Sequence, residues 1–277
     1  MIRIITDSAA DFSPQELQQR KIACIGLKVM FGETEYEENT NLTKDRFYEM
    51  LLAESQLPKT SQAAPQVLMD LFEDARDAGE EAIYITLSSA LSGTYQTACM
   101  TRDLVDWPGC YVFDSRNATG GQRMLVEYAC ALRDAGKGAP EILAALADIR
   151  DRIVLFACID TLEYLYKGGR ISQTAYTLGT LANIKPIITV DPDGGIGVPQ
   201  KAMGMRKGMD ILCKQMALRA PDPNFPVYAM YTNNRSVAET LAKKMGGVDD
   251  GQIIQVGAAI GAHIGPDACG LVYVAAK

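Results

Sequence analysis

The segment between residues 88 and 95 gathers four Ser and Thr hydroxyls and a glycine, groups that can bind an anion. It reads Ser88-Ser89-Ala90-Leu91-Ser92-Gly93-Thr94-Tyr95 and precedes a predicted helix. Such a turn offers free backbone N–H groups and hydroxyl donors at the positive end of the helix dipole. It is not a Walker A phosphate loop, because G-x-x-x-x-G-K-[ST] occurs nowhere in the chain. The pattern favours an anion site over a set of ordinary helix N-caps.

Two other predicted strands also end in small hydroxyl or acidic residues. Thr6-Asp7-Ser8 ends the first strand, and Asp114-Ser115 ends a later one. In an open α/β sheet, ligands bind in the crevice at the carboxyl ends of the strands. We therefore expect these residues to border one crevice, with helix N-capping as the alternative role.

Two shorter segments could also contact an anion. Lys59-Thr60-Ser61-Gln62 precedes the helix that Pro65 opens, and taken alone its hydroxyl pair most often caps that helix. Gly168-Gly169-Arg170-Ile171-Ser172 places a flexible turn beside Lys167, which suits an anion clamp. The same letters also fit a helix C-cap followed by a solvated arginine.

His263 is the only histidine, and this limits the catalytic options. A three-histidine metal site is impossible and H-E-x-x-H is absent, so no metal site is predicted. A serine hydrolase would need His263 together with a nucleophile such as Ser92, yet G-x-S-x-G is missing. A stand-alone hydrolase or phosphotransferase that uses Ser92 and His263 therefore stays an alternative without a supporting motif.

The hydrophobic pattern predicts the elements that carry these residues. In residues 1–150, short apolar strands alternate with helices, which predicts an α/β domain with a largely parallel sheet. The strands are expected at Ile2–Thr6, Ile22–Met30, Ala82–Thr86 and Tyr111–Phe113, and helices follow Ser13, Pro65 and Pro140.

Residues 151–277 are predicted to form a second, α+β domain. Strands are expected at Ile153–Ile159, Ile187–Val190, Val227–Tyr231, Ile253–Val256 and Leu271–Val274, and helices near Leu178, at Met209–Leu218 and at Val237–Met245. Pro192-Asp193-Gly194-Gly195 predicts the turn of an antiparallel hairpin.

Composition narrows the class of protein. The 277 residues are 48% hydrophobic and carry a net charge of −7, the wrong sign for general nucleic-acid binding. The first 150 residues hold 14 Lys and Arg against 23 Asp and Glu, whereas residues 151–277 hold 13 against 11, so the second half is the more basic. Seven scattered cysteines without C-x-x-C pairs fit a reducing cytoplasm. No export signal or membrane-spanning segment is expected.

Six motifs in order along the chain resemble those of the DegV family. They are Thr6-Asp7-Ser8-Ala9-Ala10-Asp11, Lys59-Thr60-Ser61-Gln62, Leu87 to Tyr95, Thr161 to Ile171, Lys185-Pro186-Ile187 and His263-Ile264-Gly265-Pro266. Each motif is short, but together they cover nearly the whole chain. The resemblance implies a two-domain cytoplasmic bacterial protein that holds one long-chain fatty acid between its domains.

The resemblance also implies roles for single residues. Members of this kind are non-catalytic subunits that present the acyl carboxylate to a separate ATP-binding fatty acid kinase. The implied carboxylate ligands are Thr60 or Ser61, and Ser92 with the Gly93 backbone. His263 would lie near the head group, and Arg170 would face the kinase. No cofactor is implied besides the fatty acid as ligand.

The chain departs from the family pattern at two positions. Asp267 replaces the glycine that usually follows His-x-Gly-Pro, which adds a negative charge near the expected head group. Met203 stands where arginine is frequent, which weakens the case for partner docking. A third hypothesis is a regulatory or interaction protein whose lipid is only structural.

Overall fold

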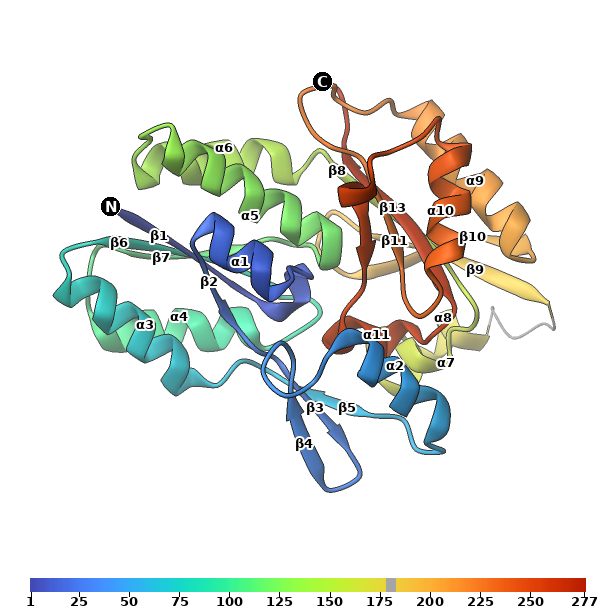
Figure 1. Cartoon of the computed structure of the whole chain (residues 1–277), viewed down its shortest axis with the longest axis horizontal. Helices are drawn as coiled ribbons and strands as arrows, with labels where there is room; N and C mark the ends of the chain where they lie inside the picture. Colours follow the sequence, from blue (N-terminus) through green and yellow to red (C-terminus); the bar gives the residue numbers. More distant parts are fainter. Residues whose placement is uncertain (178–182) are drawn as a thin grey trace.

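A four-stranded parallel sheet forms the centre of the first half in the computed structural model, which describes residues 1–177 and 183–277 (Figure 1). Its strands lie in the order β2 (Ile22–Ile25), β1 (Ile2–Asp7), β6 (Glu81–Thr86) and β7 (Cys110–Asp114). The inner strands are buried along nearly their whole length, which is typical of a parallel sheet covered on both faces. The predicted parallel α/β architecture is confirmed.

Helices cover both faces of this sheet. The pairs are α3 (Pro65–Asp77) with α4 (Thr94–Val105) on one face, and α5 (Thr119–Asp134) with α6 (Ala139–Arg150) on the other (Figure 1). The short helix α1 (Pro14–Arg20) begins with the predicted capping box, in which Ser13 and Glu16 each accept the other's backbone N–H. A 3₁₀ turn, η1 (Ser8–Ala10), follows β1.

The prediction of one continuous strand at Ile22–Met30 is wrong. The chain bends at Gly26, where a side chain would collide with Glu37 and Glu38, and two strands result. The second of them pairs in a separate antiparallel sheet, in the order β4 (Thr34–Glu37), β3 (Lys28–Phe31) and β5 (Lys59–Ser61). Helix α2 (Lys44–Ala53) connects β4 to β5.

A six-stranded mixed sheet forms the second half, as the α+β prediction expected. Its order is β10 (Ile196–Met203), β9 (Ile184–Val190), β8 (Ile153–Ile159), β13 (Ala268–Val274), β11 (Tyr228–Tyr231) and β12 (Ile253–Gln255). The predicted hairpin joins β9 to β10. The helices are α7 (Glu163–Lys167), α8 (Gln173–Thr177), α9 (Met205–Leu218), α10 (Arg235–Lys244) and α11 (Ala258–Ile264), with a 3₁₀ turn η2 (Asp250–Gln252). The helix expected near Leu178 lies outside the described residues.

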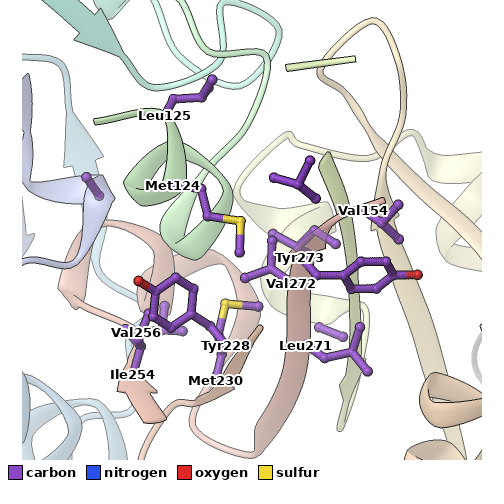
Figure 2. Close-up of a cluster of buried hydrophobic side chains, with 14 of the residues drawn as sticks. Met124, Leu125, Val154, Tyr228, Met230, Ile254, Val256, Leu271, Val272 and Tyr273 are labelled. Carbon is purple, nitrogen blue, oxygen red and sulfur yellow. The ribbon is translucent and has the colours of Figure 1, made fainter. Parts of the chain in front are cut away.

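The two sheets share one hydrophobic core. Helix α5 contacts β1 and β6 of the first half, and also β8 and β13 of the second. Figure 2 shows its Met124 among Met230, Val272 and Tyr228, which all belong to the second half. The domain boundary at residue 150 stays a prediction, and it falls between the end of α6 and the start of β8.

Candidate functional site

A cavity of about 310 Å³ lies between the two halves. Most of its wall is aliphatic and comes from both sheets and from α11. The apolar residues that line it are Leu27, Leu87, Leu91, Ala118, Leu155, Ala157, Leu165, Ile188, Val190, Ile196, Met230, Val256, Ala259, Ile260, Ile264 and Ala268. Its size falls at the lower end of the range of small-molecule pockets, about 300–1,000 Å³.

All of the predicted head-group residues line this cavity, and we call the part that they border its polar end. They are Thr60, Ser61, Ser92, Gly93 and His263, together with Arg170. They come from β5, from the turn before α4, from α11 and from the turn after α7. Ser61 and Gly93 are exposed, whereas Thr60, Ser92 and His263 are half-buried. The polar end of the cavity is therefore also its end at the protein surface.

Thr60 and His263 contact each other across 203 residues of sequence. Thr60 Oγ1 lies 2.9 Å from His263 Nε2. If Nε2 carries the proton, it donates to Thr60 Oγ1, and the threonine hydroxyl is then free to donate into the cavity. This tautomer would make Thr60 a donor to a carboxylate placed at the polar end.

The His263 ring rests against a glycine. A Cβ on Gly168 would overlap the ring at Nδ1, so only glycine leaves room for the imidazole there. Burial, with a smaller contribution from the Arg170 cation, lowers the pKa of His263 to about 4. The imidazole is therefore neutral at physiological pH, and it adds no charge beside a bound anion.

Ser92 and Gly93 form the turn at the start of α4. Ser92 Oγ lies 2.9 Å from Thr94 Oγ1 and accepts the Thr94 N–H. Gly93 is the N-cap of this twelve-residue helix and has no side chain to cap it, and the Ser92 hydroxyl instead accepts the first N–H group of the helix, that of Thr94. A Cβ on Gly93 would collide with the amide of Gln62, which also lines the cavity.

The expectation that Thr60 and Ser61 cap a helix is wrong. Both lie on strand β5, and the N-cap of α3 is Ala64, which makes no side-chain hydrogen bond. Pairing of β5 with β3 instead brings Thr60 opposite Val29 and holds it at the cavity. Because Thr60 and Ser61 lie on β5, they line the cavity and do not cap α3.

Arg170 follows a glycine C-cap, as one of the two sequence interpretations expected. Its N–H bonds the Leu165 carbonyl, and the Gly169 N–H bonds that of Tyr166, in a Schellman motif that the positive φ of Gly169 (75°) permits. The side chain is half-buried rather than solvated, and its Nε donates to the Leu91 carbonyl at 3.0 Å.

The Arg170 guanidinium pairs with no carboxylate among residues 1–177 and 183–277, and burial lowers its pKa from the usual value. It lines the cavity and also a surface hollow of about 310 Å³ next to it. This hollow is bordered by Ser89, Ala90, Leu91, Ser92, Gly93, Gln96 and Gly169.

The other hydroxyl and acidic residues at the strand ends make internal contacts. Asp7 is fully buried and accepts the N–H groups of Ala9 and Leu87, and burial raises its pKa to about 6. Ser88 donates to the Gly194 carbonyl of the β9–β10 turn at 2.8 Å. Ser115 donates to the Asn117 carbonyl. The hairpin turn therefore docks at this edge, where the crevice was expected, and the cavity opens beside it.

The geometry does not favour a hydrolase. His263 contacts Thr60 rather than Ser92, and its Nδ1 is buried without a hydrogen-bond partner, so no acid orients the ring in the described part of the chain. Within those same residues, no cluster of three or more His, Cys, Asp or Glu side chains could hold a metal ion.

Both departures from the family pattern lie at the surface. Asp267 is exposed and is not among the residues that line the cavity. Met203, at the end of β10, is 56% exposed. Neither side chain touches the polar end of the site.

Sequence reasoning missed some residues of the cavity wall. Thr119 and Thr232 add polar groups to it, and so does Gln62, which belongs to the Lys59–Gln62 segment but was given no role. The Thr232 hydroxyl donates to the Pro266 carbonyl and accepts the Ala268 N–H, which orders the chain just after His263. These contacts join distant segments, so no local pattern could have found them.

Comparisons with known proteins agree on one family. A family model described as an uncharacterised protein of the DegV family matches residues 1–276. A DegV domain-containing protein of Caldanaerobacter subterraneus is 33% identical over 276 residues, covering 98% of both chains. YteA of Lactococcus lactis is 32% identical over 286 residues and covers 99% of this chain and 98% of its own.

Solved structures show the same fold over the whole chain. A stearic acid-binding protein from Eubacterium ventriosum has a TM-score of 0.90 at 24% identity, covering 99% of this chain and 98% of its own. DegV of Bacillus subtilis, described as a fatty acid binding protein, has a TM-score of 0.84 at 26% identity and covers 99% of both. In the described part of this chain, no helix is long and apolar enough to cross a membrane.

Proposed function

The chain belongs to the DegV family, and we propose that it binds one long-chain fatty acid in the cavity between its halves. The observation that carries this proposal is the shape of the site: an aliphatic chamber with one polar end at the surface. An amphiphile with one anionic head group and a long apolar tail matches that division. The related proteins that are described as binding stearic or other fatty acids give the same indication.

The apolar tail supplies most of the binding energy. Each methylene removed from water contributes about 0.8 kcal/mol, so a chain of about 14 methylenes offers roughly 11 kcal/mol before association costs. Such a tail needs few polar contacts at the head group. The aliphatic wall, built from both halves, is suited to this role.

The head group is held by neutral donors. The Thr60 hydroxyl, oriented by neutral His263, and the turn at Ser92 and Gly93 can donate to a carboxylate without neutralising it. Ser61 lies beside them on β5 and is exposed. A carboxylate held in this way is oriented and keeps its charge, so it can still react as a nucleophile.

We infer that the bound carboxylate reacts with a second protein, because the polar end of the cavity lies at the protein surface. The protein presents the acyl carboxylate to a separate ATP-binding kinase subunit and is not itself an enzyme. The surface position of the polar end, the adjoining hollow and an Arg170 without a carboxylate partner among the described residues support this step. The lack of a Walker A loop in the sequence and the absence of a triad in the site argue against phosphotransfer or hydrolysis by this chain alone.

Mass spectrometry tests the lipid directly. Protein purified from a bacterial host is expected to release about one fatty acid per chain on denaturation, and delipidated protein should rebind hexadecanoate. In Thr60→Ala, the lost hydrogen bond should weaken binding by about 1–3 kcal/mol. Thr34→Ala, at an exposed position on β4, is the control and should bind normally. Protein that carries no acyl chain and takes up none would refute the proposal.

A further inference from the structure

The N-terminus of α11 is held by two carboxylates from the other half of the chain. Asp11 Oδ1 accepts the Gly257 N–H at 2.7 Å. Glu38 accepts the N–H of Ala258 at 2.5 Å on one oxygen and that of Ala259 at 3.3 Å on the other. These contacts join residues more than 200 positions apart, and they satisfy the first N–H groups of the helix that carries His263.

The same junction is reinforced by two side chains of α2. Lys44 Nζ donates at 2.8 Å to the carbonyls of both Asp11 and Gln255. The Tyr48 hydroxyl donates to the Val256 carbonyl at 2.9 Å. The approach is close, because a Cβ on Gly257 would overlap Glu38 and lie 3.0 Å from Asp11 Oδ1. The two carboxylates are thus near neighbours around one glycine.

Buried charge at this junction is not balanced. Asp11 is 2% exposed and Glu38 is 1% exposed. Lys44 Nζ, 3.9 Å from Asp11 Oδ1, is the only cation in an ion pair with either carboxylate among the described residues. The Arg123 cation also favours ionised Asp11, but its ion pairs are with Glu16 and Glu127. Asp11 Oδ2 is buried and has no hydrogen-bond partner within residues 1–177 and 183–277. Two ionised carboxylates against one ammonium would leave an uncompensated charge in the interior.

We propose that Asp11 and Glu38 are positioning residues for His263. Together they bind the N-terminus of α11 to the first half, and we call this set of contacts the clasp. The clasp stays closed while the two carboxyl groups hold one proton between them. This inference rests on the proposed function for its meaning, since His263 and Thr60 form the head-group end. When both carboxylates are ionised, their repulsion loosens the N-terminus of α11. His263 then moves relative to Thr60, and the head-group end is less well ordered for a ligand.

The direction of the pH effect follows from the burial of the pair. Burial and the negative neighbour Asp11 raise the pKa of Glu38 from 4.5 to about 7, and burial also raises that of Asp11. A raised carboxyl pKa stabilises the closed clasp at low pH, and this stability is lost as pH rises from 4.5 through about 7. The clasp is therefore expected to loosen on the alkaline side of neutrality.

Other titratable groups surround the pair on every side. They are Lys44, Asp45 and Tyr48 on α2, Arg123 on α5, Glu16 on α1, Asp7 on β1, Cys24 on β2 and Tyr231 on β11. Burial raises the pKa of Cys24 and of Tyr48 well above neutrality, so both stay uncharged there. Asp7, with a pKa of about 6, is the other buried acid that titrates near the same range.

The test follows the NMR signals of the imidazole in the ligand-free full-length protein between pH 6 and 9. Because His263 is the only histidine and its own pKa is about 4, it does not titrate in this range. If the clasp loosens as Glu38 ionises, the His263 signals should shift with pH, and the midpoint of this shift should lie near pH 7. In Glu38→Gln, which keeps an oxygen acceptor for the Ala258 N–H, the midpoint should vanish.

A second variant keeps the test decisive if Glu38→Gln does not fold. Asp11 has a φ of 61°, a conformation that asparagine tolerates well, so Asp11→Asn should keep the backbone. Removing this negative neighbour should lower the midpoint by about one pH unit or more. Asp7→Asn is the matched control, because the hydrogen bonds of this buried acid go to Ala9, Tyr84, Leu87 and Gln122 rather than to α11, and it should keep the midpoint near pH 7.

Binding of hexadecanoate separates this inference from the proposed function. Between pH 6 and 8 the hexadecanoate affinity of the wild type should fall by about threefold or more relative to that of Glu38→Gln. The ionisation of hexadecanoate itself affects both proteins equally and cancels in this comparison. A midpoint in the His263 signals without any hexadecanoate binding would refute the proposed function and retain the clasp. Flat His263 signals in the wild type, or an unchanged midpoint in both Glu38→Gln and Asp11→Asn, would overturn the clasp.

Discussion

At the scale of the residue, the site depends on Gly168, which is not among the residues that line the cavity. Gly168 leaves room for the His263 ring, and Gly169 allows the turn that directs Arg170 back over Leu91. From the sequence alone, these two glycines indicated either a flexible turn in an anion clamp or a helix C-cap. The structure requires glycine at the two positions for different reasons: Gly168 lies too close to the His263 ring for a side chain, and Gly169 has a positive φ.

Replacing the first of these glycines should displace the imidazole. In Gly168→Ala, the new methyl group overlaps His263, so the ring loses its contact with Thr60 and hexadecanoate affinity should fall by about tenfold. Gly251→Ala is the control, because among the described residues no heavy atom beyond Gly251 and its chain neighbours lies within 4 Å of the new Cβ. Affinity measured on folded protein decides the matter, and an unchanged value in Gly168→Ala would show that the position of His263 does not matter for binding.

Arg170 distinguishes binding from presentation. If Arg170 docks the kinase or stabilises the charge of the transferred phosphoryl group, Arg170→Ala should reduce acyl-phosphate formation by an added kinase subunit, while hexadecanoate affinity stays nearly intact. A direct salt bridge to the carboxylate predicts that both fall together. The two quantities are measured on the same variant, with the surface variant Lys167→Ala as a control for lost charge. Parallel losses would contradict the docking role, and no loss in either would leave Arg170 without a part in the site.

At the scale of the element, most of the strands and the hairpin were predictable from the sequence, but the contacts that build the site were not. Apolar runs such as Ile153–Ile159 carry their strand signal locally. The three-stranded sheet and α11 lack such a signal, because β5 has only three residues and α11 is built from alanine, glycine and isoleucine around His263. Their positions depend on Asp11, Glu38 and other residues far away in sequence.

The β9–β10 hairpin offers a test of how the elements of the two halves are held together. Ser88 donates a buried hydrogen bond to the Gly194 carbonyl, so Ser88→Ala should lower the free energy of unfolding by about 1–3 kcal/mol. Ser89→Ala, in the same turn but exposed, should change it by less than about 0.5 kcal/mol. Denaturant unfolding of both variants provides the comparison. Equal stabilities would mean that the hairpin turn contributes nothing to the junction.

At the scale of the whole molecule, the cavity lies within the contact between two halves that also share a core. A ligand there touches residues of both sheets, so its binding energy should stabilise the entire chain rather than one half. Trp107, the only tryptophan, lies between α4 and β7 and reports on the first half. Its fluorescence can be compared with circular dichroism, which reports on all elements.

Removal of the lipid should therefore lower the stability of both halves together. At a free hexadecanoate concentration of about 100 times Kd, linkage adds about 2.7 kcal/mol, and Tm should rise by roughly 5–10 °C over the delipidated protein. The fluorescence and circular dichroism transitions should coincide and shift equally, because the ligand bridges the two sheets. Octanoate at the same free concentration should raise Tm far less, since it buries about eight fewer methylenes at about 0.8 kcal/mol each. Equal shifts with both acids would mean that only the head group is bound and that the aliphatic wall does not take the chain.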